Sequence, residues 1–482
     1  MLSTRPLAAD LVALVPAIEQ FLEQLAGLEL SRAELEQIAV RLRPRAVALA
    51  PDAQRRLLGG LLALMVRVDG DESPDGRVSV DRVIALEDAR SFVLSGCEVL
   101  PPARIPLADA LGLVVAGAIA ATELVPPFDN TAMDGFAVRA ADTPGELAIV
   151  GTLAAGAAPT VEVGPGQAIR IMTGAPMPAG ADAVVMVERT STSNDGRVVQ
   201  IEAAAGSGDN VRRAGDDLRQ GDVVIEGGSP LTPAHLGVLA SIGVEEVMAH
   251  PRPTVGVLST GDELVEGAGP LRPGQIRDSN RRMLLALLAE SGCVPVDLGL
   301  ARDDEAAIAA SIRRGVERCD ALLTSGGVSM GDFDYVKSVL GEMGEMRWMQ
   351  VAIRPAKPLA FGTVDGVPVL GLPGNPVSSL VSFELFARPA LRRMTGWPPD
   401  GLDRPRVRAV AAEDLRRRPD GKAHFVRVAA HFADDGRLHV RSTGAQGSHQ
   451  LAATAAANAL AVLPDGEGVV AGGEVDILLL RL

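Results

Sequence analysis

The chain has 482 residues, which is too long for one hydrophobic core, so three or four domains are expected. Its formal net charge is −15 and only 3% of its residues are aromatic, which argues against nucleic acid or an anionic membrane as its main ligand. The three cysteines, Cys97, Cys293 and Cys319, form no C-x-x-C pair, which fits a reducing cytoplasm. Cys293 and Cys319 lie at the edges of apolar runs, so we expect these two to be buried spectators.

The first 77 residues are predicted to be helices followed by an acidic linker. Ser31 and Glu34 have the spacing of a capping box at the start of an apolar, helix-periodic run. The apolar stretch 57–66 is too short to span a bilayer and is typical of a buried helix. No residue pattern here suits chemistry, so we expect a helical extension with a packing or partner-binding role.

The next part of the chain has a mixed pattern of strands, turns and two helices. The first helix is predicted over 78–96, with Ser79 or Asp81 as its N-cap. The second begins after Thr232, with Pro233 at its first position. Between them, apolar runs alternate with Gly/Pro turns, which indicates a β-rich region.

Residues 253–398 alternate between strand and helix patterns, which predicts an α/β domain with a mostly parallel sheet. Asp365-Gly366 separates two apolar runs and predicts a tight hairpin. Asn375 is expected to cap a helix that begins at Pro376. The remaining residues, to 482, read as short strands of a small β domain.

Four polar, glycine-rich loops are expected at one edge of this sheet. In a doubly wound sheet, ligands bind beyond the carboxyl ends of the strands. The loops that follow the four predicted strands are 259–263, 301–304, 324–329 and 372–379. Their convergence predicts a site more strongly than any one motif does.

The expected edge combines anion-binding backbone with carboxylates. Gly326, Gly327, Gly374 and the helix start at Pro376 offer N–H donors to an anion. A cation must bridge an anion and nearby carboxylates, and Mg²⁺ suits few carboxylates plus a phosphate. Of the acids, Asp304 and Asp332 are expected to be helix caps. The full acidic set is Asp262, Glu263, Asp303, Asp304, Asp332 and Asp334.

The loop "TSGGVSMGDFDY" (324–335) has two interpretations. Residues 327–331 read G-x-S-x-G, the pattern of a serine-hydrolase nucleophile elbow centred on Ser329. An elbow puts its serine directly after the strand, whereas Ser329 follows two glycines and a valine. We therefore favour an anion-binding loop in which the Ser329 hydroxyl donates to the anion.

Several long motifs resemble those of the molybdopterin molybdenumtransferase family (bacterial MoeA and the E domain of gephyrin). They are "PPFDNTAMDGFAVRAAD", "IRIMTGAPMPAGADAVVMVE", "STGDEL", "GQIRDSN", "TSGGVSMGDFDY", "RPAKPLAFG", "GLPGNPVSS" and "TGAQGSHQL". The resemblance runs from about residue 78 to 482. It implies insertion of molybdenum from molybdate into adenylylated molybdopterin, with release of AMP and Mg²⁺ support.

The resemblance also implies a domain plan and partners. An elongated domain (78–125 with 211–252) carries an inserted β-rich domain (126–210). An α/β domain (253–398), like that of the MogA-like adenylyltransferases, precedes a C-terminal β domain (399–482), and residues 1–77 lie outside the family pattern. A homodimer is implied, with each site shared between the two chains, and the molybdopterin adenylyltransferase is a further possible partner.

The resemblance assigns roles to matching residues. The catalytic set is Asp134, Thr173, Glu263, Asp303 and Asp334, of which Glu263 and Asp303 would hold the metal. The substrate-binding set is Arg212, Asp217, Ser325, Gly326, Gly327, Ser329, Arg354, Lys357, Pro373, Asn375, Pro376, Ser378, Arg427 and Ser448.

The chain departs from the family pattern at one motif. Family members often have Lys-Pro-Gly-Lys-Pro with a lysine four residues earlier, whereas this chain has Arg354-Pro355-Ala356-Lys357 after Gln350. Arg keeps the charge and binds oxyanions bidentately. Two other functions stay open from sequence: a serine hydrolase that uses Ser329, and a non-catalytic scaffold.

Overall fold

The computed structural model describes residues 83–328 and 335–481. The predictions for residues 1–77, Ser329, Asp332 and Asp334 lie outside the described residues. Within the described part of the chain, no helix has the length and apolar character needed to cross a bilayer.

A seven-stranded sheet forms the α/β layer of the molecule. Four neighbouring strands, β22, β18, β14 and β17, run parallel, and β21 is antiparallel to both β19 and β22. This confirms the mostly parallel sheet. Across the sheet the strands are β1 (Val83–Ile84), β19 (Glu345–Val351), β21 (Pro358–Val364), β22 (Val367–Leu372), β18 (Ala321–Ser325), β14 (Thr254–Thr260) and β17 (Val294–Ala301).

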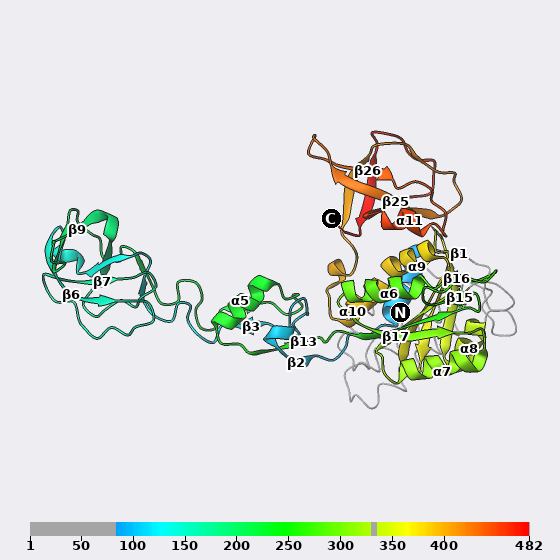
Figure 1. The fold of residues 1–482 in the computed structure, drawn as a ribbon, viewed down its shortest axis with the longest axis horizontal. Coiled ribbons are helices and arrows are strands. Elements are labelled where there is room, and N and C mark those ends of the chain that lie inside the picture. Colours follow the sequence, from blue (N-terminus) through cyan, green and yellow to red (C-terminus); the bar gives the residue numbers. More distant parts are fainter. Residues whose placement is uncertain (1–82, 329–334, 482) are drawn as a thin grey trace, which may run out of the picture. The chain divides into compact units, whose positions relative to one another are not determined.

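Helices cover both faces of this sheet (Figure 1). Two separate apolar cores result, one on each face. Strands buried on both faces need continuous apolar runs, and β14 and β18 are buried along almost their whole length. One face carries α4 (Leu86–Ser95), α6 (Asn280–Glu290), α9 (Pro376–Ser382) and α10 (Arg388–Met394); the other carries α7 (Glu305–Val316) and α8 (Tyr335–Met343).

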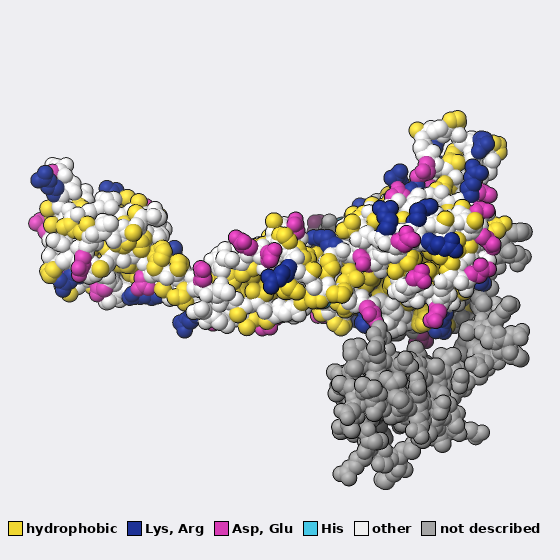
Figure 2. Space-filling view, turned by 90° about the horizontal axis from the view of Figure 1, so that it is seen from below, with side chains coloured by type: hydrophobic (Ala, Val, Ile, Leu, Met, Phe, Trp, Pro, Cys, Tyr) yellow, Lys and Arg dark blue, Asp and Glu magenta, His cyan; other side chains and the backbone are white. Residues whose placement is uncertain are grey.

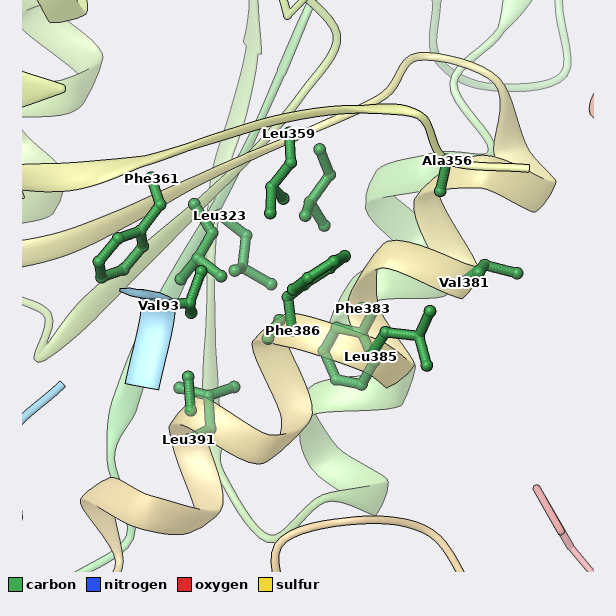
Figure 3. Close-up of a cluster of buried hydrophobic side chains, with 14 of the residues drawn as sticks. Val93, Leu323, Ala356, Leu359, Phe361, Val381, Phe383, Leu385, Phe386 and Leu391 are labelled. Atoms are coloured by element: carbon green, nitrogen blue, oxygen red, sulfur yellow. The ribbon is translucent and has the colours of Figure 1, made fainter. Parts of the chain in front are cut away.

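A π-helical turn joins α9 to α10 and fills the larger core. Phe383–Ala387 form this turn, and Pro389 follows in the first turn of α10. Because Pro389 has no N–H, it cannot bond the carbonyl four residues back, and the Leu385 carbonyl instead accepts from Arg90 at 2.5 Å. Figure 3 shows Phe386 from this turn among the apolar side chains of the core, which include Leu323 and Leu359 from the sheet.

The helix predicted over 78–96 begins later than expected. Val83–Ile84 form strand β1, and α4 starts after Ala85, so neither Ser79 nor Asp81 is its cap. The cause is a non-local bond, because the Ile84 carbonyl accepts from the Ala352 N–H beyond the end of β19. The cap at Thr232 is confirmed: its hydroxyl accepts from the His235 N–H, in a reciprocal capping box.

Segments far apart in sequence pair in the region around α5 (Pro233–Ser241). Three two-stranded ladders bring residues 103–131 against residues 211–249. They are β2 (Ala103–Pro106) with β13 (Glu246–Ala249), β3 (Ile119–Ala120) with β12 (Val223–Ile225), and β4 (Asn130–Thr131) with β11 (Val211–Arg212).

Two six-stranded sheets form the other large β layers of the described fold. The six-stranded sheet between β4 and β11, here called the inserted sheet, has the order β8 (Ala183–Met186), β5 (Gly135–Val138), β7 (Gln167–Ile171), β6 (Gly145–Leu153), β10 (Val198–Ile201) and β9 (Thr190–Thr192). The C-terminal sheet has the order β20 (Ile353–Arg354), β25 (Ala423–Phe432), β26 (Leu438–Ser442), β23 (Arg406–Ala411), β29 (Glu474–Leu479) and β27 (Ala459–Leu463). In Figure 2, basic and acidic side chains are interspersed over the described residues of the face in view.

The three cysteines are buried and unpaired, which confirms the prediction for Cys293 and Cys319. Burial raises the pKa of the Cys97 thiol and of the Cys293 thiol to about 12 each. A thiol with so high a pKa is protonated at neutral pH and is a poor nucleophile or metal ligand.

Candidate functional site

The four loops predicted to converge do follow neighbouring parallel strands. The order β17, β14, β18, β22 puts their carboxyl ends in a row at one edge of the seven-stranded sheet. Hydrogen bonds tie neighbouring loops together. The Gly261 N–H donates to the Ala301 carbonyl, and the Gly326 N–H donates to the Leu372 carbonyl.

The glycine loop after β18 has the backbone expected of an anion cradle. Gly326 and Gly327 have φ values of 96° and 70°, which residues with a side chain rarely adopt. A Cβ at Gly326 would also lie 3.0 Å from the Thr260 carbonyl of the next loop. Ser325 is buried as the last residue of β18, where its hydroxyl accepts from Asn280 at 2.8 Å.

The acidic residues separate into two roles. Asp304 caps α7 by accepting from the Ala307 N–H at 2.8 Å, which confirms that prediction. Asp262 and Asp303 join the β14 and β17 loops reciprocally, because each carboxylate accepts from the other residue's N–H at 3.3 Å. Glu263 is exposed beside them.

Glu263 and Asp303 are the described residues that would hold a magnesium ion together with substrate. Within residues 83–328 and 335–481, no group of three His, Cys, Asp or Glu side chains gathers as a complete metal site. Mg²⁺ is usually held by one or two carboxylates together with waters and substrate phosphates. Glu263 and Asp303 beside an N–H cradle match that incomplete protein ligand set.

Asp134 and Thr173 are in direct contact. The Asp134 Oδ1 accepts from both the N–H and the hydroxyl of Thr173, at 2.7 Å each. These two bonds hold the pKa of the Asp134 carboxyl below its ordinary value, with the N–H as the larger cause. The carboxylate is exposed, so its second oxygen remains open to a ligand.

The segment "MDG" is not a plain Asp-Gly turn. Gly135 is the first residue of β5, where it pairs with Ile171 and Met186. A Cβ at Gly135 would lie 2.1 Å from the Val185 carbonyl, so β8 can approach only a glycine here. The close strand contact fixes the backbone directly after Asp134.

Arg212 lies beside the Asp134 loop, through strand pairing. It pairs with Asn130 in the β11–β4 ladder, four residues before Asp134. Its neighbour Arg213 is held by Asp129 at 2.7 Å, whereas Arg212 is exposed. Asp217 is exposed as well, and its N–H donates to the Val125 carbonyl. Strand pairing thus brings the Arg212 backbone next to the segment that leads to Asp134.

The start of α9 differs in detail from the prediction. Asn375 occupies the N-cap position, but its side chain makes no capping hydrogen bond. Pro376 has no N–H, and the Val377 N–H donates to the Ser448 carbonyl at 3.1 Å. The helix start therefore offers fewer free donors than expected, and Ser448 contacts it through its backbone. Pro373 and Ser378 are buried close by.

Arg354 presents its charge to solvent. Its side chain is 70% exposed and its nearest acidic partner, Asp420, is 4.0 Å away. Lys357 is exposed three residues later, and its carbonyl accepts from the Val351 N–H. Both cations are free in geometry to approach an oxyanion.

Arg427 is bound within the C-terminal domain instead. Its side chain is buried, and its five N–H groups reach the loop 445–450 and Thr454. Arg427 could contact an anion directly only by giving up one of these bonds. Its geometry fits the role of holding the loop that carries Ser448, and the substrate-binding role implied by the resemblance stays a prediction.

Three family models match the chain. They are described as the MoeA N-terminal region (domain I and II), over residues 84–243, a probable molybdopterin binding domain, over 256–393, and the MoeA C-terminal region (domain IV), over 408–480. A molybdopterin molybdenumtransferase of Haemophilus influenzae is 40% identical over 402 residues, which cover 81% of this chain and 97% of that protein. The chain belongs to the molybdopterin molybdenumtransferase family.

Other relatives agree with this membership. The molybdopterin molybdenumtransferase of Bacillus subtilis is 35% identical over 389 residues, which are 78% of this chain and 89% of that protein. A molybdopterin biosynthesis MoeA protein from Pyrococcus horikoshii has a solved structure that superposes with a TM-score of 0.68 at 29% identity. That match covers 83% of this chain and all of the other.

The departure from the family motif has a structural cost. Ala356 stands where family members often have glycine, and its φ is 77°. An L-residue in this left-handed region costs about 1–2 kcal/mol. Ala356 is buried among the residues of the larger core (Figure 3), so its methyl contributes apolar burial that offsets part of that cost.

Sequence reasoning missed two buried residues at the edge. Asn280 and Arg281 open α6 and are 8% and 2% exposed. The sequence signal for Asn280 is the motif "GQIRDSN" (274–280), which it ends, whereas Arg281 lies just outside that motif. Polar side chains that polar partners keep buried beside a site deserve a functional hypothesis.

Proposed function

We propose that the protein inserts molybdenum from molybdate into adenylylated molybdopterin, releases AMP and requires Mg²⁺. The observation that carries this proposal is the row of four loops at one sheet edge, which sets an N–H cradle beside carboxylates. Membership of the molybdenumtransferase family supports the same substrate class. All ligands of the proposed reaction are anions or carry phosphate, as the cradle requires.

Each half of the edge has a part in this reaction. The glycine loop 325–327 receives the adenylate phosphate or molybdate through the Gly327 N–H, since the Gly326 N–H already donates to the Leu372 carbonyl. Arg354 and Lys357 add mobile cations. Glu263 and Asp303 hold Mg²⁺, which neutralises charge on the phosphate. Crowded carboxylates beside an anion repel it, so metal and phosphate should bind together.

Asp134 supplies the remaining carboxylate. One of its oxygens is fixed by Thr173, so the other has a defined direction in which to orient a water or molybdate at the phosphoanhydride. We propose that Asp134, Thr173 and Arg212 serve the α/β edge of a second chain in a cytoplasmic homodimer. Each dimer then has two composite sites.

The decisive experiment measures AMP release from adenylylated molybdopterin. The protein is incubated with this substrate, with and without molybdate and with and without Mg²⁺. We expect AMP release and molybdenum incorporation that need both additions. Release without molybdate at the same rate, or no release by a folded protein, would contradict the proposal.

Metal binding gives a second test. Calorimetric titration of Mg²⁺ should show tighter binding when an adenylylated ligand is present than when it is absent. Equal affinity in the two titrations would show that Mg²⁺ does not bind together with the phosphate. It would contradict the assignment of Glu263 and Asp303 as ligands of a metal that substrate completes.

A further inference from the structure

The first turn of α6 contacts the loops at the site edge from inside the protein. Asp278, Asn280 and Arg281 are buried, and the backbone N–H of Arg281 bonds back to Asp278. The Ser259 hydroxyl, at the end of β14, donates to Asp278 at 3.1 Å. Their hydrogen-bond partners include residues of the loops at the site edge and neighbouring backbone.

Asn280 joins the glycine loop to the loop after β22. Its Nδ2 donates to the Ser325 hydroxyl at 2.8 Å and to the Gly374 carbonyl at 2.7 Å. A carbonyl can only accept, so the amide must present its nitrogen on this side. Both N–H groups are used, and a buried amide with two such bonds sets the spacing between the two loops.

Arg281 holds the other half of the edge. Its guanidinium pairs with Asp278 at 2.9 Å and also bonds Asp297 and Glu266. Glu266 lies three residues after Glu263, directly after β15 (Leu264–Val265). The Arg281 side chain is 3% exposed and its pair with Asp278 is buried on both sides. Glu266 and Asp297 are 50% and 39% exposed, so the pairs with these two carboxylates are partly screened by solvent.

A second contact fixes the same acidic loop. Strand β16 (Ile276–Arg277) runs beside β15, and the Ile276 N–H donates to the Glu263 carbonyl at 2.8 Å. The Asp278 N–H donates to the Val265 carbonyl. The backbone of Glu263 is thus held by the strand that leads into α6, while Arg281 holds the loop after it.

We propose that Asn280 and Arg281 are positioning residues for two different loops. Asn280 fixes the position of the glycine loop that receives the anion. Arg281, through Glu266, fixes the position of the loop that carries Glu263. Neither residue needs to touch substrate. The inference rests on the proposed function for its kinetic consequences, but its structural consequence can be measured without any substrate.

Hydrogen–deuterium exchange of the full chain tests the structural consequence. Asn280→Ala removes both bonds between the two loops, so exchange should quicken in residues 325–328 and 374–378 while residues 261–266 keep the wild-type rate. Glu266→Ala removes the ion pair between Arg281 and Glu266 and leaves Arg281 paired with Asp278 and Asp297, so the protein should fold. Exchange should then quicken in residues 261–266 alone.

Two neighbouring residues provide matched controls. Ser279 occupies the N-cap position of α6, but its side chain makes no capping bond, so Ser279→Ala should leave both loops unchanged. Arg282 approaches the same Glu266 and Asp297, but at 3.9 and 4.0 Å from a 71% exposed side chain. Arg282→Met should therefore also resemble wild type.

The kinetic readout separates positioning from a general loss of stability. In Asn280→Ala, the half-saturating concentration of adenylylated molybdopterin should rise about tenfold, with the Mg²⁺ requirement unchanged. In Glu266→Ala, the half-activating Mg²⁺ concentration should rise about two- to fivefold, with substrate affinity unchanged. A merely structural role would move both constants together.

The outcomes distinguish this inference from the proposed function. If wild-type protein releases no AMP, the proposed function fails, and the exchange experiment alone decides the inference. If each variant loosens both loops, or if neither loosens its own loop, the division of duties between Asn280 and Arg281 is wrong.

Discussion

Two carboxylate regions of the molecule are immobilised in opposite ways. Asp134 lies exposed beside the inserted sheet and is fixed by Thr173, in the turn after β7, through two bonds to one oxygen. Glu263 lies exposed at the α/β edge, where its backbone is held and its loop is anchored by the buried Arg281. One carboxylate is oriented directly and the other through its main chain.

The difference teaches where each region is vulnerable. At Asp134, loss of one hydroxyl changes the carboxylate itself, because the partner touches the reactive group. At the α/β edge, under the proposed function, the buried Arg281 would control the position of Glu263 without contacting the ligand itself. Catalytic geometry is sensitive to such supports, since small displacements of a positioned group lose much of its effect.

The largest expected loss of activity comes from substituting the carboxylate of each region in turn. Asp134→Asn and Glu263→Gln should each reduce AMP release by about 10²–10⁴-fold, the range for a general-base or positioning group. When the two variants exchange subunits, half of the dimers should be mixed, with one intact site of two. Activity should then return to about a quarter of wild type.

The control for subunit exchange uses chains with different tags. Recovery of mixed dimers by sequential affinity purification shows that exchange occurred. If such dimers release no AMP, the site is not shared between chains, and Asp134 acts within its own chain.

Arg354 tests whether the α/β edge needs a guanidinium or only a charge. Arg354→Ala should raise the half-saturating molybdate concentration about 10- to 100-fold, because charge-assisted bonds contribute about 1.5–3 kcal/mol. Arg354→Lys should have a smaller effect, since lysine keeps the positive charge and loses only the two parallel N–H donors of the guanidinium. Unchanged molybdate dependence in Arg354→Ala would place this residue outside the site.

Substitution of Thr173 tests whether its hydroxyl is needed to orient the Asp134 carboxylate. Thr173→Val removes the hydroxyl bond but keeps the N–H bond, so AMP release should fall about tenfold, while Thr173→Ser should stay near wild type. In the double variant with Asp134→Asn, the loss should match that of Asp134→Asn alone. Additive losses would show that Thr173 acts independently of Asp134.

The same substitution predicts a pH effect. Thr173 lowers the pKa of Asp134, so the carboxylate stays ionised as the pH falls below the ordinary range for an aspartate. In Thr173→Val the pKa should rise toward that range, and the acid limb of kcat/KM should move to higher pH. Carbon-13 NMR titration of the Asp134 carboxyl measures the shift directly; an unchanged pKa would contradict the assigned cause.

The smallest effect is expected outside both regions. Removal of residues 1–76 should leave kcat/KM for AMP release unchanged, because the family match begins at residue 84. Dimeric truncated protein that releases no AMP would show that this extension takes part in the reaction.

Local sequence patterns were sufficient to predict most of the helices and strands and the row of loops at the α/β edge. Apolar runs, caps such as Thr232 and Asp304, and the Asp365-Gly366 hairpin were all predicted, and the parallel strand order then brought the loops together. Asp365 and Gly366 indeed have φ values of 50° and 81°, as a tight primed turn requires.

The structural features that were not predicted from the sequence arise from contacts between distant segments. Strand β1 exists because Ile84 meets Ala352, and the π turn is accommodated because Arg90 reaches Leu385. The bonds of Asn280 span 45 and 94 residues. Such pairings leave no local periodicity, so the residues appear in sequence as ordinary polar positions near a helix start.

The burial of all three native thiols has a practical consequence for the dimer test. Cys97, Cys293 and Cys319 are the complete cysteine complement, and none is exposed or paired. A maleimide dye added at neutral pH should therefore leave the native chain unlabelled and attach to a single cysteine introduced on the surface. Donor- and acceptor-labelled chains could then report subunit exchange by energy transfer in real time, in an otherwise wild-type background.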